Sequence, residues 1–349
     1  MIMRFSRDTH TPSRTGASGA LARTEGLAAA LGAVAVLATV LGAALAPALA
    51  AAPLSAQSNA RAIDAAATEV PVARVGTILI AHGAGAEWNS QVERIAHTAK
   101  TGGPLEVAYL MGEAAKEHRF QDVVKSLADS GVSEIVVVPL LVSSHSGHYE
   151  QIRYLAGETD SLSEMMMHHL HMSGIERPAT DIPIRVSRAL DDAPEMARVL
   201  EQRALALAKR PSEQALFLVG HGPNSAEDNA LWMRNLRVVA DSVRAAAGFR
   251  DVRVGLVRDD APAEVRAEAV KGVRELIGLQ HQLTGRQVVV VPVLISKGRV
   301  SREKFLADLA GLDVVYTGEP LLPSPELARW IESRVRETSR GAVVNSARR

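Results

Sequence analysis

A short apolar segment that ends in His-Gly occurs twice in this chain of 349 residues. The first copy, Val75–Gly83, reads VGTILIAHG, and the second, Ala215–Gly222, reads ALFLVGHG. Short apolar runs that glycine stops are typical of buried strands in a parallel sheet. His82 and His221 would then stand where each strand passes into its loop. In open α/β sheets, ligands bind at this carboxyl edge.

Two more sequence blocks repeat in the same order. Ile135–Ser144, IVVVPLLVSS, matches Val288–Ser296, VVVVPVLIS, and the motifs PEMAR and PELAR begin at Pro194 and Pro325. Three ordered matches indicate a duplicated domain. Helical spacing between the apolar runs predicts βαβ units. We therefore expect an α/β protein of two tandem similar domains, each a parallel sheet flanked by helices on both faces.

Composition limits the function of the chain. The formal net charge is +0 and aromatic residues make up only 3 %, so neither a basic surface nor base stacking favours nucleic acid as a partner. The absence of cysteine from the sequence excludes a thiolate metal site and a thiol nucleophile. The sequence offers no phosphate-binding glycine loop, so we expect no nucleotide cofactor. Any metal would be held by His, carboxylate or Met side chains.

The N-terminal region has the pattern of an export signal. Arginines precede Leu27–Leu45, a run without charge, and Ala48-Leu49-Ala50 supplies a small-x-small cleavage pattern. We expect a periplasmic protein with no stable membrane association after cleavage. The alternative is an uncleaved anchor, because about twenty apolar residues can span a bilayer. The predicted regions are a signal peptide at 1–50, an Ala-rich linker at 51–74, a first domain at 75–210, a second domain at 211–337 and a tail at 338–349.

Histidines gather at the predicted carboxyl edge of the first sheet. The chain after the third strand reads SSHSGH, which places His145 and His148 three positions apart on a glycine-containing loop. Imidazole suits first-row divalent metals, and His82 would meet this loop if the first and third strands are neighbours. Glu113, after the second strand, is a possible proton acceptor. The predicted metal ligands are His82, His145 and His148, and the predicted catalytic residues are His82, His148 and Glu113.

The blocks TILIAHGAGAEWN, EVAYLM, IVVVPLLVSSHSGH and IRYLAG together resemble the sirohydrochlorin chelatases. These are the cobaltochelatases and ferrochelatases of the class II tetrapyrrole chelatase superfamily. The resemblance covers Val75–Gly157 well and Ala215–Val335 in a degraded form. It implies two similar domains with a cleft between them, where a tetrapyrrole binds.

The resemblance also implies which side chains hold the incoming metal. In the family, one ligand is the His of the first His-Gly motif and another is a His in the loop after the third strand. His82 and His148 match these positions, with His145 close by. The loop is one residue longer here, which leaves the register of His145 against His148 open. Glu113 matches the family's acidic position only approximately.

The implied reaction is insertion of a divalent ion into a sirohydrochlorin-like tetrapyrrole, with Co²⁺, Fe²⁺ or Ni²⁺ as the substrate metal. Neutral imidazoles can hold such an ion and can accept a proton at neutral pH. The alternative is a non-catalytic exported protein that binds metal or tetrapyrrole. Export favours this alternative, because chelatases of this family serve cytoplasmic cobalamin or sirohaem synthesis. The combination of His82 with His148 favours the enzyme, and the oligomeric state is open.

An insert around Asp160–Asp181 distinguishes the first half from the second, and it contains the sequence MMMHHLHM. Met and His select copper, nickel or cobalt. A helical insert in which Met fills space is an equal alternative. As a metal-loading lid, the insert would bind metal independently of the His82 site.

The second half lacks the loop histidines of the first. Its loop, Ser296–Val300, reads SKGRV. We therefore expect the second half to form a wall of the cleft, with His221 outside the metal site. The charged stretch Arg258–Asp260 is predicted to be a solvated surface.

Overall fold

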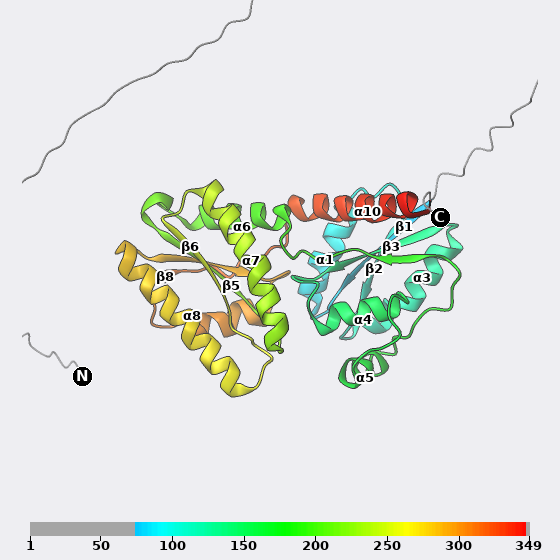
Figure 1. The fold of residues 1–349 in the computed structure, drawn as a ribbon, viewed down its shortest axis with the longest axis horizontal. Helices are drawn as coiled ribbons and strands as arrows, with labels where there is room; N and C mark the ends of the chain where they lie inside the picture. Colours follow the sequence, from blue (N-terminus) through cyan, green and yellow to red (C-terminus); the bar gives the residue numbers. More distant parts are fainter. Residues whose placement is uncertain (1–73, 347–349) are drawn as a thin grey trace, which may run out of the picture. The chain divides into compact units, whose positions relative to one another are not determined.

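The computed structural model describes residues 74–346. It contains two parallel sheets of four strands each, and the strand order is the same in both. The predicted α/β class, with two similar parallel sheets flanked by helices, is confirmed (Figure 1). The first sheet has the order β2-β1-β3-β4 and the second the order β6-β5-β7-β8. The strands are β1 (Val75–Ala81), β2 (Leu105–Tyr109), β3 (Glu134–Leu140), β4 (Ile184–Val186), β5 (Ala215–Gly220), β6 (Asp251–Leu256), β7 (Val288–Val293) and β8 (Val314–Val315).

Strands β1 and β3 are neighbours, which is the condition under which the sequence places His82 beside the loop of His148. Their register pairs Ala81 with Leu140, so both strands end at the same level of the sheet. Every residue of β3 is buried, which is the expected environment of a central parallel strand. Pro139 lacks a backbone donor, but β4 pairs only with Ile135–Val137 of β3, so no ladder bond to β4 is lost there.

Helices surround both sheets and connect their strands. The α-helices are α1 (Ala86–Thr98), α2 (Ala114–Glu117), α3 (Phe120–Asp129), α4 (Gly147–Leu155), α5 (Glu164–Met172), α6 (Pro194–Leu207), α7 (Ala226–Ala247), α8 (Ala263–Thr284), α9 (Phe305–Asp308) and α10 (Pro325–Ser346). A 3₁₀ helix, η1 (Pro211–Glu213), precedes β5, and a π-helix, η2 (Val300–Lys304), precedes α9. None of these described helices is long and apolar enough to cross a membrane. The predicted signal peptide and most of the predicted linker lie outside the described residues.

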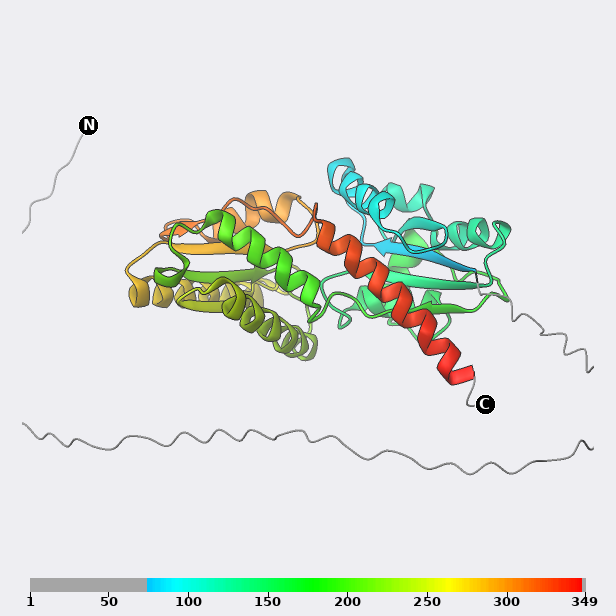
Figure 2. The same cartoon turned by 90° about the horizontal axis from the view of Figure 1, so that it is seen from above.

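The last helix of each half packs on the sheet of the other half. Helix α6 contacts α7 and β7, whereas α10 contacts α1, β1 and β3. Figure 2 shows α10 in red lying along the first sheet. Trp330 of α10 is fully buried, and Arg198 of α6 donates to Glu326 of α10 at 2.7 Å. The repeated PEMAR and PELAR motifs therefore begin two helices that join the halves, and all the described residues belong to one compact unit.

Candidate functional site

A tight turn at the end of β1 fixes the position of His82. The next residue, Gly83, has a φ of +87°, and a Cβ atom there would lie 2.3 Å from the carbonyl oxygen of Met111. Only glycine fits such a position without strain. Gly222 repeats the conformation after His221, with a φ of +80°. The His-Gly dipeptide is thus a structural device that presents one imidazole at the carboxyl edge of each sheet.

The β3–α4 loop brings His148 to His82. The two imidazole rings meet edge to face, with centroids 4.7 Å apart and planes at 80°. Both side chains are partly buried. The neighbouring strands β1 and β3 thus bring His82 to the β3–α4 loop, and the role of the pair as a metal site stays a prediction.

Buried polar contacts hold the loop that carries His148. Asp191, which is 1 % exposed, accepts hydrogen bonds from the backbone N–H of Ser144 at 2.8 Å and from its hydroxyl at 2.7 Å. Ser146 caps α4 by accepting from the N–H of Tyr149. Asn235 of α7 donates to Asp191 at 3.3 Å, so the second half also supports the loop. Satisfied buried networks of this kind keep a loop in one conformation.

Hydrogen bonds fix which nitrogen of each imidazole is free. Nδ1 of His82 lies 2.7 Å from the Gly83 carbonyl oxygen, which can only accept a hydrogen bond. Gln151 donates from Nε2 to the carbonyl oxygen of Met166 at 2.8 Å, which turns its Oε1 towards Nδ1 of His148, also at 2.8 Å. Both Nδ1 atoms therefore carry the proton, and both Nε2 atoms keep a lone pair. Such outer hydrogen bonds orient metal-binding histidines in proteins.

Burial keeps the two imidazoles neutral. It is the largest cause that lowers the pKa of His82 below its ordinary value. Burial, followed by the neighbouring His82, lowers the pKa of His148 to about 4. At neutral pH each ring is thus an uncharged nitrogen donor, the form in which imidazole binds metals. The arrangement can hold a first-row divalent ion without a charged ligand.

His145 serves the loop through its backbone. Its carbonyl oxygen accepts from the indole N–H of Trp232 at 2.6 Å, and its own N–H donates to the hydroxyl of Ser143 at 3.1 Å. These contacts anchor the loop to α7 of the second half. The role of the His145 side chain as a metal ligand stays a prediction.

Glu113 lies at the start of α2 and faces solvent. Its side chain is 89 % exposed and pairs with the ammonium group of Lys116 at 3.0 Å. This exposed pair provides no support for the predicted proton-accepting role of Glu113. The carboxylate whose charge acts on His82 is instead Asp260.

The second half contributes an ion pair that sequence reasoning assigned to a solvated surface. Nε2 of His221 lies 2.9 Å from a carboxylate oxygen of Asp260. Burial opposes protonation of His221, but the hydrogen bond to Asp260 and its charge raise the pKa of His221 above its ordinary value. The same hydrogen bond lowers the pKa of Asp260. The charge of His221 also lowers the pKa of His82, so this pair belongs to the surroundings of the His82–His148 site.

Asp259 extends this pair into a network of charges. Ligand atoms of His221, Asp259 and Asp260 lie within 4.8 Å of one another, which is a spacing that a metal could use. The carboxylate of Asp259 is 1 % exposed, however, and already pairs with Lys304 at 2.5 Å and Arg266 at 3.1 Å. Two cations compensate its charge, so the network stabilises the end of β6 without needing an ion.

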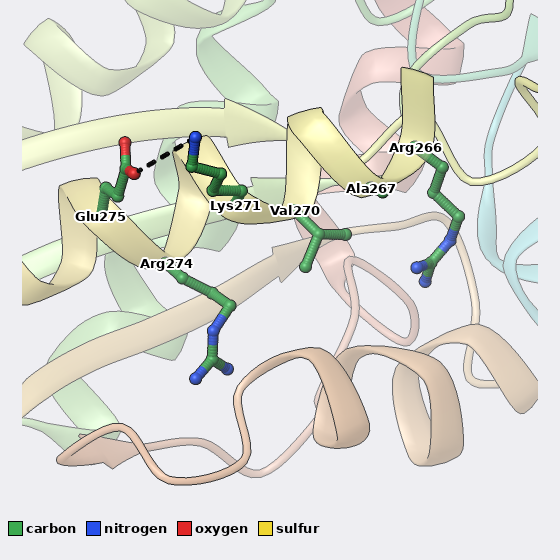
Figure 3. Close-up of a pocket in the computed structure, with 6 residues that line it drawn as sticks. All are labelled: Arg266, Ala267, Val270, Lys271, Arg274 and Glu275. Atoms are coloured by element: carbon green, nitrogen blue, oxygen red, sulfur yellow. Dashed lines mark ion pairs between the residues drawn. The ribbon is translucent and has the colours of Figure 1, made fainter. Parts of the chain in front are cut away.

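An open hollow of about 540 Å³ lies along α8 (Figure 3), lined by Arg266, Ala267, Val270, Lys271, Arg274 and Glu275. Its cationic groups have partners already. Arg266 pairs with Asp308 at 2.9 Å, Arg274 donates to the carbonyl oxygen of Ala310 at 3.0 Å, and Lys271 lies 4.0 Å from Glu275. None of the predicted site residues lines this hollow, so we do not assign it a function.

Comparison with known proteins supports the fold. The CbiX family model matches residues 76–207, which include β1 to β4 and the histidine loop. The solved structure of SirB from Bacillus subtilis with Fe³⁺ superposes with a TM-score of 0.53 at 16 % identity, covering 76 % of this chain and 95 % of that chain. The sirohydrochlorin chelatase SirB from Bacillus subtilis subspecies spizizenii in complex with cobalt gives a TM-score of 0.51, with the same identity and coverage. Comparison with curated protein sequences gives no match.

Proposed function

We propose that this chain is a metal chelatase that inserts a divalent ion into a sirohydrochlorin-like tetrapyrrole, because the CbiX family model matches its residues 76–207. The observation that carries this proposal is the neutral pair of His82 and His148, with ring centroids 4.7 Å apart. The pair stands where β1 and β3 end in a fold that is shared with the SirB structures.

The reaction needs an ion that is held firmly enough to be captured and loosely enough to be passed on. Two neutral imidazoles meet this demand, because they bind borderline metals without neutralising the ion's charge. Their free Nε2 atoms would replace two waters of the hydrated ion. The remaining coordination positions stay available for solvent and then for the macrocycle nitrogens.

The same two imidazoles can also accept the protons that the macrocycle releases. As the ion enters the macrocycle, two pyrrole N–H protons leave, and the Nε2 atoms that have just released the ion are the nearest free bases. The lowered pKa of His148 means that it passes a proton on to solvent and does not retain it. His221 cannot share this task in the same way, because its Nε2 already faces Asp260.

We propose Co²⁺ as the first metal to test, with Fe²⁺ and Ni²⁺ as alternatives of the same donor preference. Purified mature protein, sirohydrochlorin and each metal should be mixed, and the macrocycle absorbance followed. Conversion of many macrocycles per protein supports the chelatase. One bound metal or macrocycle per protein without conversion would support the non-catalytic binding protein instead.

Export remains part of the proposal. The basic start, apolar run and Ala-x-Ala pattern support secretion to the periplasm, with the uncleaved anchor as the alternative. A periplasmic chelatase would meet its metal outside the cytoplasmic metal buffers. This setting would favour a protein with its own means of metal capture.

A further inference from the structure

The Met/His insert forms a helix that packs against the metal-site loop. Helix α5 contacts α4, and Figure 1 shows the two helices adjacent at the edge of the first half. The carbonyl oxygen of Met166 accepts the hydrogen bond from Gln151, the side chain that orients His148. A Cβ atom at Gly147 would lie 2.7 Å from the Met166 sulfur, so the thioether fills the space beside the residue that precedes His148.

Only one face of α5 is directed towards this site. Met166 and His169 are three residues apart and share that face. Met165 and Met172 are 60 % and 71 % exposed. His168 and His171 are exposed as well. The thioethers and imidazoles that made the insert conspicuous in the sequence are thus mostly in solvent. Of the three imidazoles of α5, His169 alone is partly buried.

His169 carries a buried nitrogen atom for which a partner is needed. Its Nδ1 atom is buried and, within the described part of the chain, has no hydrogen-bond partner. A buried polar atom of this kind requires an explanation, such as a bound ion or water. The charge of His169 is also among the smaller causes that lower the pKa of His82 and the pKa of His148.

We propose that His169 is a third imidazole ligand, which the insert brings to the ion held by His82 and His148. This inference rests on the proposed metal site of the chelatase and extends it. Among the residues that the structure describes, these three rings do not yet have the mutual spacing of a closed metal triad. The ion would therefore draw His169 inwards, and α5 would act as a capture arm and not as a separate metal-binding lid.

A three-imidazole site matches the demands of capture and transfer. Three neutral nitrogens bind a first-row divalent ion more tightly than two and leave further positions for water or a macrocycle. The third ligand sits on a helix of nine residues in which Met165, His168, His171 and Met172 are exposed. The helix could therefore withdraw His169 while His82 and His148 keep their hydrogen-bonded orientation. Loss of one ligand would then precede transfer of the ion.

Co²⁺ binding to the full mature chain, without any macrocycle, tests this assignment. His169→Ala should weaken Co²⁺ binding at least about tenfold by calorimetry, and should change the visible absorption of the bound Co²⁺. His168→Ala and His171→Ala remove exposed imidazoles from the same helix and should bind Co²⁺ like the wild type. Equal affinity of His169→Ala and wild type would overturn the proposal.

A measurement on the wild type alone guards against misfolding of the variant. X-ray absorption of the Co²⁺-loaded protein counts imidazoles around the metal, and the proposal requires three. A count of two would overturn it. If His169→Ala weakens binding but the wild type converts no macrocycle, the ligand assignment stands and the chelatase proposal fails. If the wild type converts macrocycles and His169→Ala binds Co²⁺ normally, the chelatase stands and the ligand assignment fails.

Discussion

Gln151 gives the sharpest single perturbation of the site, because it connects His148 to the insert. Its side chain is 0 % exposed and makes two hydrogen bonds of 2.8 Å, one with Nδ1 of His148 and one to the carbonyl oxygen of Met166. Gln151→Leu keeps a similar volume and removes both. Each buried group left without a partner costs about 1–3 kcal/mol of folding free energy.

The larger expected effect of Gln151→Leu is on metal binding. Removing an outer hydrogen bond from a metal-binding histidine costs about 10–100-fold in affinity, which is about 1.4–2.7 kcal/mol. Without Gln151, nothing in the described structure selects the tautomer of His148 that frees Nε2. Calorimetric titration with Co²⁺ would measure this loss, and chemical denaturation of the metal-free protein would measure the change in stability separately.

Two variants control this experiment. Gln121→Leu also removes a 2.8 Å hydrogen bond to the insert, from Nε2 to the carbonyl oxygen of Gly174, but at an exposed position without contact to His148. It should leave Co²⁺ affinity unchanged. Gln151→Glu keeps the acceptor for His148 and loses only the donor to Met166, so it should recover part of the affinity. If Gln151→Leu binds Co²⁺ as tightly as the wild type, the reasoning about the tautomer is refuted.

Four further results are expected. His221→Ala should lower Co²⁺ affinity much less than tenfold, because Asp260 already occupies Nε2 of His221; calorimetry showing a loss equal to that of His82→Ala would contradict this. Co²⁺ binding should persist as pH falls through about 6.5, where ordinary imidazoles protonate, and should be lost towards about 4, the pKa of His148; a midpoint near 6.5 in a pH titration would contradict it. Stability should fall over the same interval, because the unfolded His148 binds a proton there and the folded one does not. Mass measurement of the natural N-terminus should show cleavage near Ala50, and a chain that still begins with its initiator methionine in the cytosol would refute export.

The fold was largely predictable because the sequence patterns that predict its central strands are local and occur twice. Apolar runs closed by His-Gly predicted β1 and β5, and the matched valine-rich runs predicted β3 and β7. The short strands β4 and β8 were missed, since two or three partly buried residues carry no periodic signal. The sequence also did not predict that α6 and α10 each pack on the sheet of the other half. Amphipathic spacing shows that a helix has a buried face, but not which sheet that face covers.

The site was predictable only where the topology determined it. Neighbouring strands necessarily bring His82 and the His148 loop together. His169 and Asp260 lie far from these residues in sequence, and their positions depend on how whole helices pack. Asp260 belongs to a charged stretch, which is typical of solvated surface. Its place after β6, the neighbour of the strand that ends in the second His-Gly motif, was nevertheless a usable signal. Gln151 could not be identified at all, because its role depends on the direction of two hydrogen bonds.

The proposed role of His82 and His148 is to pass a divalent ion to a tetrapyrrole. The most direct measurement is the initial rate of Co²⁺ insertion into sirohydrochlorin, compared among wild type, His82→Ala and His148→Ala at equal protein concentration. The account predicts a wild-type rate well above that of buffer and a fall of both variants towards the buffer rate. A wild-type rate no higher than that of buffer, or variants as fast as wild type, would contradict it.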